Sequence, residues 1–161
     1  MYPQVVLFGS VGGGWREAHI IPMLEELGVT YFNPVQQDGW TAEDGAREAD
    51  YMAHAETIIM VINNTTPAYT ALAESGWAAL GARERGQTLV LYVMQDTFHA
   101  APPWWLRWVP WVRETAASTE HYAASLRKLM QEHARAFELD SLHVVDSMEG
   151  VIKALRARYG Q

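Results

Sequence analysis

The 161-residue sequence contains no cysteine, which excludes disulfides, cysteine-ligated zinc sites and thiol nucleophiles. Long apolar runs are also absent. The longest, residues 58–62 and 89–94, are far shorter than the ~20 residues that span a bilayer. Basic residues are few, with 12 Lys and Arg against 19 Asp and Glu and a net charge of −7. Because polymer binding depends on cationic neutralisation of phosphates, neither a nucleic-acid polymer nor a membrane is an expected partner.

The composition that remains is that of an ordinary globular chain, 49% hydrophobic and 19% charged. Its length predicts a single domain over residues 1–161. The six histidines show no metal-ligand spacing, so neither a metal nor a cofactor is expected. The first residues lack the basic and apolar regions of a secretory signal, and we expect a cytoplasmic protein.

Short apolar runs alternate with amphipathic stretches along the whole chain. The expected strands are residues 5–8, 29–32, 58–62, 89–94 and 143–145, and the expected helices are 15–27, a stretch that starts after Thr41, 70–85, 118–137 and 148–158. Residues 95–117 are expected to be irregular or to carry a short tryptophan-rich helix. The alternation predicts an α/β, flavodoxin-like doubly wound sandwich, in which a five-stranded parallel sheet has the order 2-1-3-4-5.

Ligands in such folds bind beyond the carboxyl ends of the strands, where the first and third strands diverge. The loop after the first strand begins at Gly9 and Ser10 and continues with glycines at 12–14. It matches neither a dinucleotide-binding fingerprint nor a Walker loop. Two interpretations stay open, a set of backbone donors for a ligand and a plain tight turn.

Glu74 is the most informative polar residue of the helix after the third strand. With Thr66 or Thr70 as the helix cap, it falls in the first or second turn, beside an expected buried stripe of Ala73, Gly76 or Trp77, and Leu80. The helix dipole is expected to keep it ionised, as a nucleophile requires; the alternative is a solvated surface glutamate. Asp50 or Asp38 is a candidate for the second carboxyl that retaining glycosyl transfer needs.

Four short segments within residues 4–94 match one known family. They are Gly9-Ser10 followed by Trp15-Arg16, Tyr31-Phe32-Asn33-Pro34 followed by Trp40, Glu48-Ala49-Asp50, and Ala73-Glu74-Ser75-Gly76. With them the chain resembles the nucleoside 2-deoxyribosyltransferases, in particular their shorter, transferase-like branch. The resemblance implies transfer of a 2-deoxyribosyl group between nucleobases through a covalent ester on Glu74, with Asp50 handling the nucleobase.

The resemblance also implies the partners, a 2′-deoxynucleoside and a free nucleobase, and a homo-oligomeric protein. The substrate-binding residues it implies are Gly9, Ser10, Trp15, Asn33, Asp38, Trp40, Asn63 and Tyr69. Ala68 stands where longer members carry a sugar-binding aspartate, so sugar recognition must differ, with Asn63, Tyr69 or Ser75 as candidates. Two alternatives remain: an N-glycosidase, in which water replaces the acceptor base, and a binding module without turnover. A nucleotide-specific hydrolase would need a phosphate cradle, for which residues 12–14, Arg16 and Ser75 are the candidates.

Four tryptophans, at 104, 105, 108 and 111, crowd the region after the fourth expected strand. Three interpretations compete. The cluster is a lid that stacks on a nucleobase, a subunit interface, or core packing under a long connection.

Overall fold

The structure is a computed structural model that describes residues 1–35, 39–94, 96, 98–136 and 141–160. Its strands are β1 (Val5–Gly9), β2 (Tyr31–Phe32), β3 (Thr57–Ile62), β4 (Thr88–Val93) and β5 (Leu142–Val145). Its helices are η1 (Arg16–Ile20), α1 (Ile21–Glu26), α2 (Ala42–His54), α3 (Tyr69–Arg85), η2 (Trp104–Leu106), α4 (Pro110–Ala136) and α5 (Met148–Tyr159). All strand pairs are parallel and the order is β2-β1-β3-β4-β5, which confirms the predicted doubly wound α/β fold.

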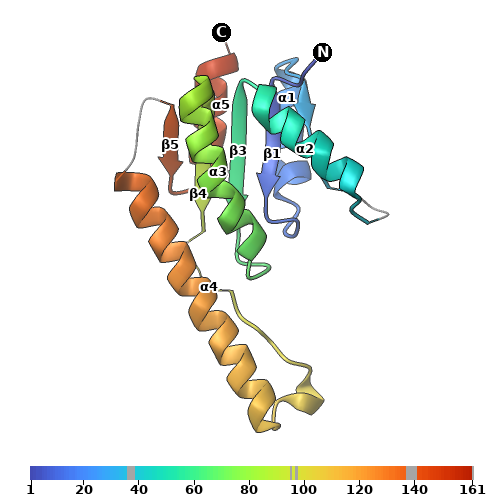
Figure 1. Cartoon of the computed structure of the whole chain (residues 1–161), viewed down its shortest axis with the longest axis vertical. Helices are drawn as coiled ribbons and strands as arrows, with labels where there is room; N and C mark the ends of the chain where they lie inside the picture. Colours follow the sequence, from blue (N-terminus) through green and yellow to red (C-terminus); the bar gives the residue numbers. More distant parts are fainter. Residues whose placement is uncertain (36–38, 95, 97, 137–140, 161) are drawn as a thin grey trace.

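The sheet is covered on both faces (Figure 1). Alternate residues of the central strands face opposite sides, as pleating requires. Val6 and Met60 belong to the core shared with α3, whereas Leu7 and Ile59 belong to the core shared with α1 and α5. β3 is buried along its whole length, as expected for a central parallel strand.

Two of the predicted helices differ from the observed ones. The stretch expected at 15–27 starts with the π-helical turn η1, because Pro22 has no N–H to continue a regular α-helical ladder. The helix expected at 118–137 starts eight residues earlier, at Pro110, since proline is well tolerated in a first helical turn. The tryptophan run therefore leads directly into α4.

The expected buried stripe and cap of α3 are wrong. Trp77 and Leu80 are exposed, and the buried residues of the helix are Ala71, Leu72, Ser75, Ala78, Gly81 and Ala82. The N-cap is Ala68, which has a positive φ of 57° and makes no side-chain capping bond. Small residues form the inner face because α3 lies close against the sheet.

Gly9 ends β1 at the point where the chain passes closest to β3. Its φ is 118°, a conformation that favours glycine, and a Cβ atom there would collide with the carbonyl of Val61. The close approach lets the Ser10 N–H donate to the Val61 carbonyl at 2.8 Å. No other residue type fits this position without moving one of the two strands.

We expect Gly9→Ala to lower the free energy of unfolding by about 3 kcal/mol, through the clash and the strained φ together. Gly28→Ala is the matched control, because Gly28 also has a positive φ but no atom lies near its Cβ position. It should cost only about 1 kcal/mol. Urea unfolding measures both variants, and equal losses would contradict the assigned role of the Val61 carbonyl.

Candidate active site

A pocket of about 530 Å³ opens at the carboxyl end of β1, between α2 and α3. Its lining residues are Phe8, Gly9, Val11, Arg16, Pro34, Val35, Trp40, Glu48, Thr70, Ala71 and Glu74. The lining is mostly apolar, with two carboxylates and one guanidinium among its polar groups. Size, composition and place are those of a small-molecule site in a doubly wound fold. We call it the candidate pocket.

Glu74 lies in the second turn of α3, half-buried, with its side chain on the candidate pocket. Within the described part of the chain its carboxylate accepts no hydrogen bond. Burial raises the pKa of Glu74, and the negative charge of Glu48 raises it further. We expected the helix dipole to favour the ionised form of Glu74 and so to lower its pKa, and this direction is wrong. The dipole effect fades beyond the first turn, and burial outweighs it.

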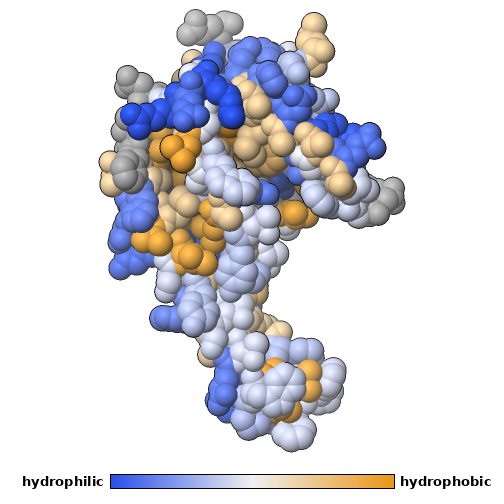
Figure 2. Space-filling view, viewed as in Figure 1, coloured by the Kyte–Doolittle hydropathy of each residue, from blue (hydrophilic) through white to orange (hydrophobic). Residues whose placement is uncertain are grey.

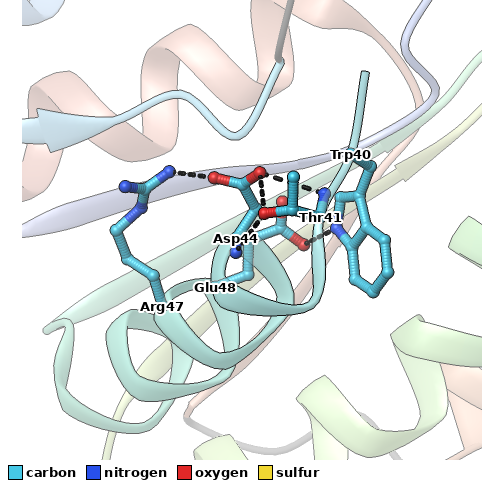
Figure 3. A network of polar contacts seen from close by, with 5 residues as sticks. All are labelled: Trp40, Thr41, Asp44, Arg47 and Glu48. Atoms are coloured by element: carbon cyan, nitrogen blue, oxygen red, sulfur yellow. Dashed lines mark hydrogen bonds and ion pairs between the residues drawn. The ribbon is translucent and has the colours of Figure 1, made fainter. Parts of the chain in front are cut away.

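Glu48 is the second carboxylate of the candidate pocket. Burial raises its pKa as well, opposed by the indole N–H of Trp40, which donates to Glu48 Oε2 at 3.4 Å. Figure 3 shows how α2 arranges this pair at its start. Thr41 caps the helix, with its hydroxyl donating to Asp44 Oδ2 at 2.6 Å and the Asp44 N–H returning a bond to Thr41 Oγ1. The predicted cap at Thr41 is confirmed.

Trp40 packs its ring directly on α2. A Cβ atom at Gly45 would collide with the Trp40 ring, so the glycine provides the space in which the indole lies. The side chain is still 65% exposed, and its ring forms part of the pocket wall. An exposed aromatic ring beside two carboxylates is a surface on which a flat ligand can stack.

Arg16 closes the inner end of the candidate pocket from η1. Its buried guanidinium donates to the carbonyls of Leu7, Ser10 and Gly9 at 3.1, 2.9 and 3.4 Å and stacks on the Trp15 ring. Burial lowers its pKa to about 10, which leaves it cationic at neutral pH. Arg16 thus holds the end of β1 in place at the inner end of the candidate pocket.

A second polar network joins the loops after β1 and β3. The Asn63 N–H donates to Ser10 Oγ at 3.1 Å, and Asn63 Nδ2 donates to the Gly12 carbonyl at 2.6 Å. Asn63 Oδ1 accepts from the N–H and the hydroxyl of Thr65. All three polar groups of Asn63 are therefore used within the protein, and the network fixes the loops that flank the pocket.

The residues predicted for the site fall into three groups. Glu74, Gly9 and Trp40 line the candidate pocket. Ser10, Trp15 and Asn63 lie buried behind it. Two others lie at its margin or outside it: Asn33 is next to the lining residue Pro34, and Tyr69 is exposed and donates to the Thr119 carbonyl. Asp38 lies outside the described residues.

Asp50 is placed apart from the candidate pocket. It is exposed on α2, where it accepts from the Tyr2 hydroxyl at 3.4 Å and pairs with His54 at 3.1 Å. Two residues correspond to more than half a turn of helix, so Asp50 and Glu48 point to different sides of α2. The structure brings Glu48, not Asp50, to Glu74.

Two polar lining residues, Thr70 and Glu48, were not assigned to the site from the sequence, although a signal existed for each. Thr70 precedes Glu74 by four residues, which places both on one side of α3. Glu48 follows Gly45 by three residues on the side of α2 that Trp40 covers. Arg16 was predicted only as a candidate for a phosphate cradle, and its burial is seen only in the structure.

Neither a metal site nor a membrane-crossing helix is found among the described residues. No group of three or more histidines, aspartates or glutamates gathers there as metal ligands would, and no helix there is both long and apolar enough to cross a bilayer.

Comparisons with known proteins add little to this site. Models of known protein families give no match, and neither do curated proteins. One solved structure that matches is described as a conserved protein from Enterococcus faecalis V583. It is 13% identical, the match covers 98% of this chain and 99% of that chain, and the TM-score is 0.49. That description names no activity, so the site is interpreted from its own residues.

We expect Glu74→Gln to stabilise the protein at neutral pH. A carboxyl whose folded-state pKa is raised costs stability once it must ionise, so wild-type stability relative to Glu74→Gln falls as pH rises through that pKa. Below about pH 4 both side chains are neutral and the difference should vanish. Urea unfolding at several pH values measures it, with Glu84→Gln, an exposed glutamate of the same helix, as control. A pH-independent difference would contradict the prediction.

Proposed function

We propose that this protein transfers a 2-deoxyribosyl group between nucleobases through a glycosyl ester on Glu74. One observation carries the proposal: Glu74 and Glu48 share one pocket beside the exposed ring of Trp40. Retaining glycosyl transfer uses two carboxyl groups, one as nucleophile and one as acid and base, and this pocket has two carboxyl groups and room for a sugar. The resemblance to the deoxyribosyltransferase family, which places the nucleophile at Glu74, supports the same chemistry.

The reaction needs two displacements at the anomeric carbon C1′. In the first, a Glu74 oxygen attacks C1′, the C1′–N bond breaks, and the departing base takes its electron pair and a proton from Glu48. In the second, a nitrogen of the incoming base attacks C1′ and the C1′–O bond to Glu74 breaks, which releases Glu74 as a carboxylate. The proton of the attacking nitrogen passes to Glu48. The two inversions give net retention at C1′.

The hydrogen bonds of the two glutamates support this division of roles. The Glu74 oxygens have no protein donor within the described residues, so a substrate carbon has free access to them. Glu48 has one oxygen on the Trp40 N–H, which fixes the orientation of its carboxyl. Because each pKa is raised, the pair keeps a proton at a higher pH than two ordinary glutamates would. This direction favours retention of the proton that the general acid of the reaction must donate.

The remaining lining suits a nucleoside better than a nucleotide. Trp40, Pro34 and Val35 offer apolar surface to a base, and the Thr70 hydroxyl lies one turn before Glu74, within reach of a sugar hydroxyl. The candidate phosphate cradle is not assembled at this pocket. Residues 12–14 do not line it, Ser75 donates to the Leu72 carbonyl, and Arg16 is committed to three backbone carbonyls.

Hydrolysis is a second candidate outcome of the same intermediate. The 65% exposure of Trp40 leaves one wall of the pocket open to water, which can replace the acceptor base in the second displacement. The two outcomes differ only in what resolves the ester. A new nucleoside marks the transferase and free 2-deoxyribose marks the N-glycosidase.

Incubation with a 2′-deoxynucleoside should produce a deoxyribosyl adduct on the Glu74 peptide, seen by intact-mass and peptide analysis. Glu74→Gln should lose both adduct and turnover, and Glu48→Gln should slow base release by about 10²–10⁴-fold. Asp50→Asn, on the outer side of the same helix, is the control and should react like wild type. An active Glu74→Gln variant would overturn the proposal, and an adduct on Glu48 would exchange the two roles.

Gly45→Ala tests whether Trp40 holds the base. The added methyl group displaces the indole from α2, and with it the N–H that donates to Glu48, while Glu74 is untouched. Alanine is itself favourable inside a helix by about 0.5–1 kcal/mol. Loss of stacking worth about 1–3 kcal/mol should raise KM about tenfold, with folding retained. Steady-state kinetics gives the result, and Gly76→Ala on α3, with no atom near its Cβ position, is the control. An unchanged KM would remove Trp40 from base binding.

A further inference from the structure

The first half of α4 and the chain that leads into it project away from the body of the protein (Figure 1). We call residues 98–122 the arm. Its four tryptophans, Trp104, Trp105, Trp108 and Trp111, are 80%, 54%, 77% and 68% exposed. Of the three interpretations of this cluster, core packing is wrong. A lid over the candidate pocket also lacks support, because none of the four rings lines it.

A continuous exposed stripe runs along α4 from the arm to the body. Its members recur every three or four residues and all are exposed: Trp111, Thr115, Ser118, Tyr122, Leu126, Leu129 and His133. The stripe contains no Asp, Glu, Lys or Arg. The buried side of the same helix, with Ala123, Arg127 and Ala134, packs on the body. A charge-free stripe that presents tryptophan, tyrosine and leucine side chains to water is suited to packing on another helix.

A groove lies beside the stripe at the carboxyl-terminal half of α4. It has a volume of about 380 Å³ and is lined by residues of α3, β4, α4 and β5, among them Leu80, Met130, His133 and Leu142. Figure 2 shows apolar residues gathered where α3 and the upper part of α4 lie side by side, and the arm standing clear of the body. The arm and the groove thus occupy opposite ends of one exposed stripe.

We propose that the partner of this surface is a second copy of the same chain, with the two α4 helices packed antiparallel about a twofold axis near Ser118 and Tyr122. This register places Trp111 of one copy opposite Leu129 of the other. It also carries the tryptophan tip of each arm to the groove of the other copy. In a closed, isologous dimer each copy contributes the same surface, so the arm of one copy must fit the groove of the other, and the reverse.

The available area matches the demand of a stable dimer. Each large aromatic side chain buries about 150–250 Å² when covered, so four tryptophans alone supply about 600 Å² per copy. The leucines and tyrosine of the stripe add to this, against about 800 Å² per partner in a standard interface. Residues 98–102 of the same chain lie beside Trp111 and Thr115, but both side chains, like the rest of the stripe, stay exposed.

Sedimentation velocity of the full chain should show a dimer at micromolar concentrations. Trp108→Ser and Trp111→Ser should each weaken association by about tenfold or more, because buried tryptophans dominate interface energies. Trp77→Ser is the matched control: Trp77 is 75% exposed but lies on neither the arm nor the stripe nor the groove. Circular dichroism confirms that the variants fold, as expected for side chains exposed in the monomer.

Since the sequence has no cysteine, single cysteines test the register directly. An equimolar mixture of Ser118→Cys and Tyr122→Cys chains should form an inter-chain disulfide under mild oxidation, because this register places the two positions opposite each other. A mixture of Ala117→Cys and Tyr122→Cys chains should not, because Ala117 lies on another side of α4. A monomer, a dimer insensitive to the arm tryptophans, or equal cross-linking in both mixtures would overturn the proposal. Binding of the arm to lipid vesicles by a monomeric protein would overturn it as well.

Discussion

The close approach of β1 and β3 at their carboxyl ends is the constraint on which the candidate pocket depends. Gly9 has no side chain, so the Ser10 N–H can reach the Val61 carbonyl, and the two strands stay in register to their last residue. The loops beyond are then near enough for Asn63 to bond both Ser10 and Gly12. The Arg16 guanidinium donates hydrogen bonds to the Ser10 and Gly9 carbonyls of this turn.

Burial, and not the helix dipole, sets the acid–base behaviour of the pocket. The positive end of a helix stabilises a carboxylate over about one turn, and Glu74 lies beyond it. Its half-buried position beside Glu48 works in the other direction. Keeping two carboxyl groups together costs stability whenever both must ionise, a cost that is reasonable only where a proton has to be exchanged with a ligand.

The sequence predicts the sheet order, the capped start of α2 and the place of Glu74, because each depends on local pattern or on strand–helix alternation. It does not predict which of Glu48 and Asp50 faces the pocket, since two residues of a helix differ by more than half a turn. It also assigns Ser10 and Asn63 to the ligand, where the structure shows them bonded to each other across 53 residues of sequence. Polar side chains after parallel strands have two possible partners, a ligand or the neighbouring loop, and only the three-dimensional distances decide between them.

α3 connects the two surfaces that the structure leaves open. One side of this helix carries Thr70 and Glu74 to the candidate pocket, and another side carries Leu80 to the groove beside α4. Its first residue, Tyr69, donates to the Thr119 carbonyl at the base of the arm, and Arg127 of α4 donates at 2.7 Å to the Asn63 and Thr66 carbonyls just before it. These contacts tie the start of α3, the helix that carries Glu74, to α4, although no residue of the arm lines the candidate pocket.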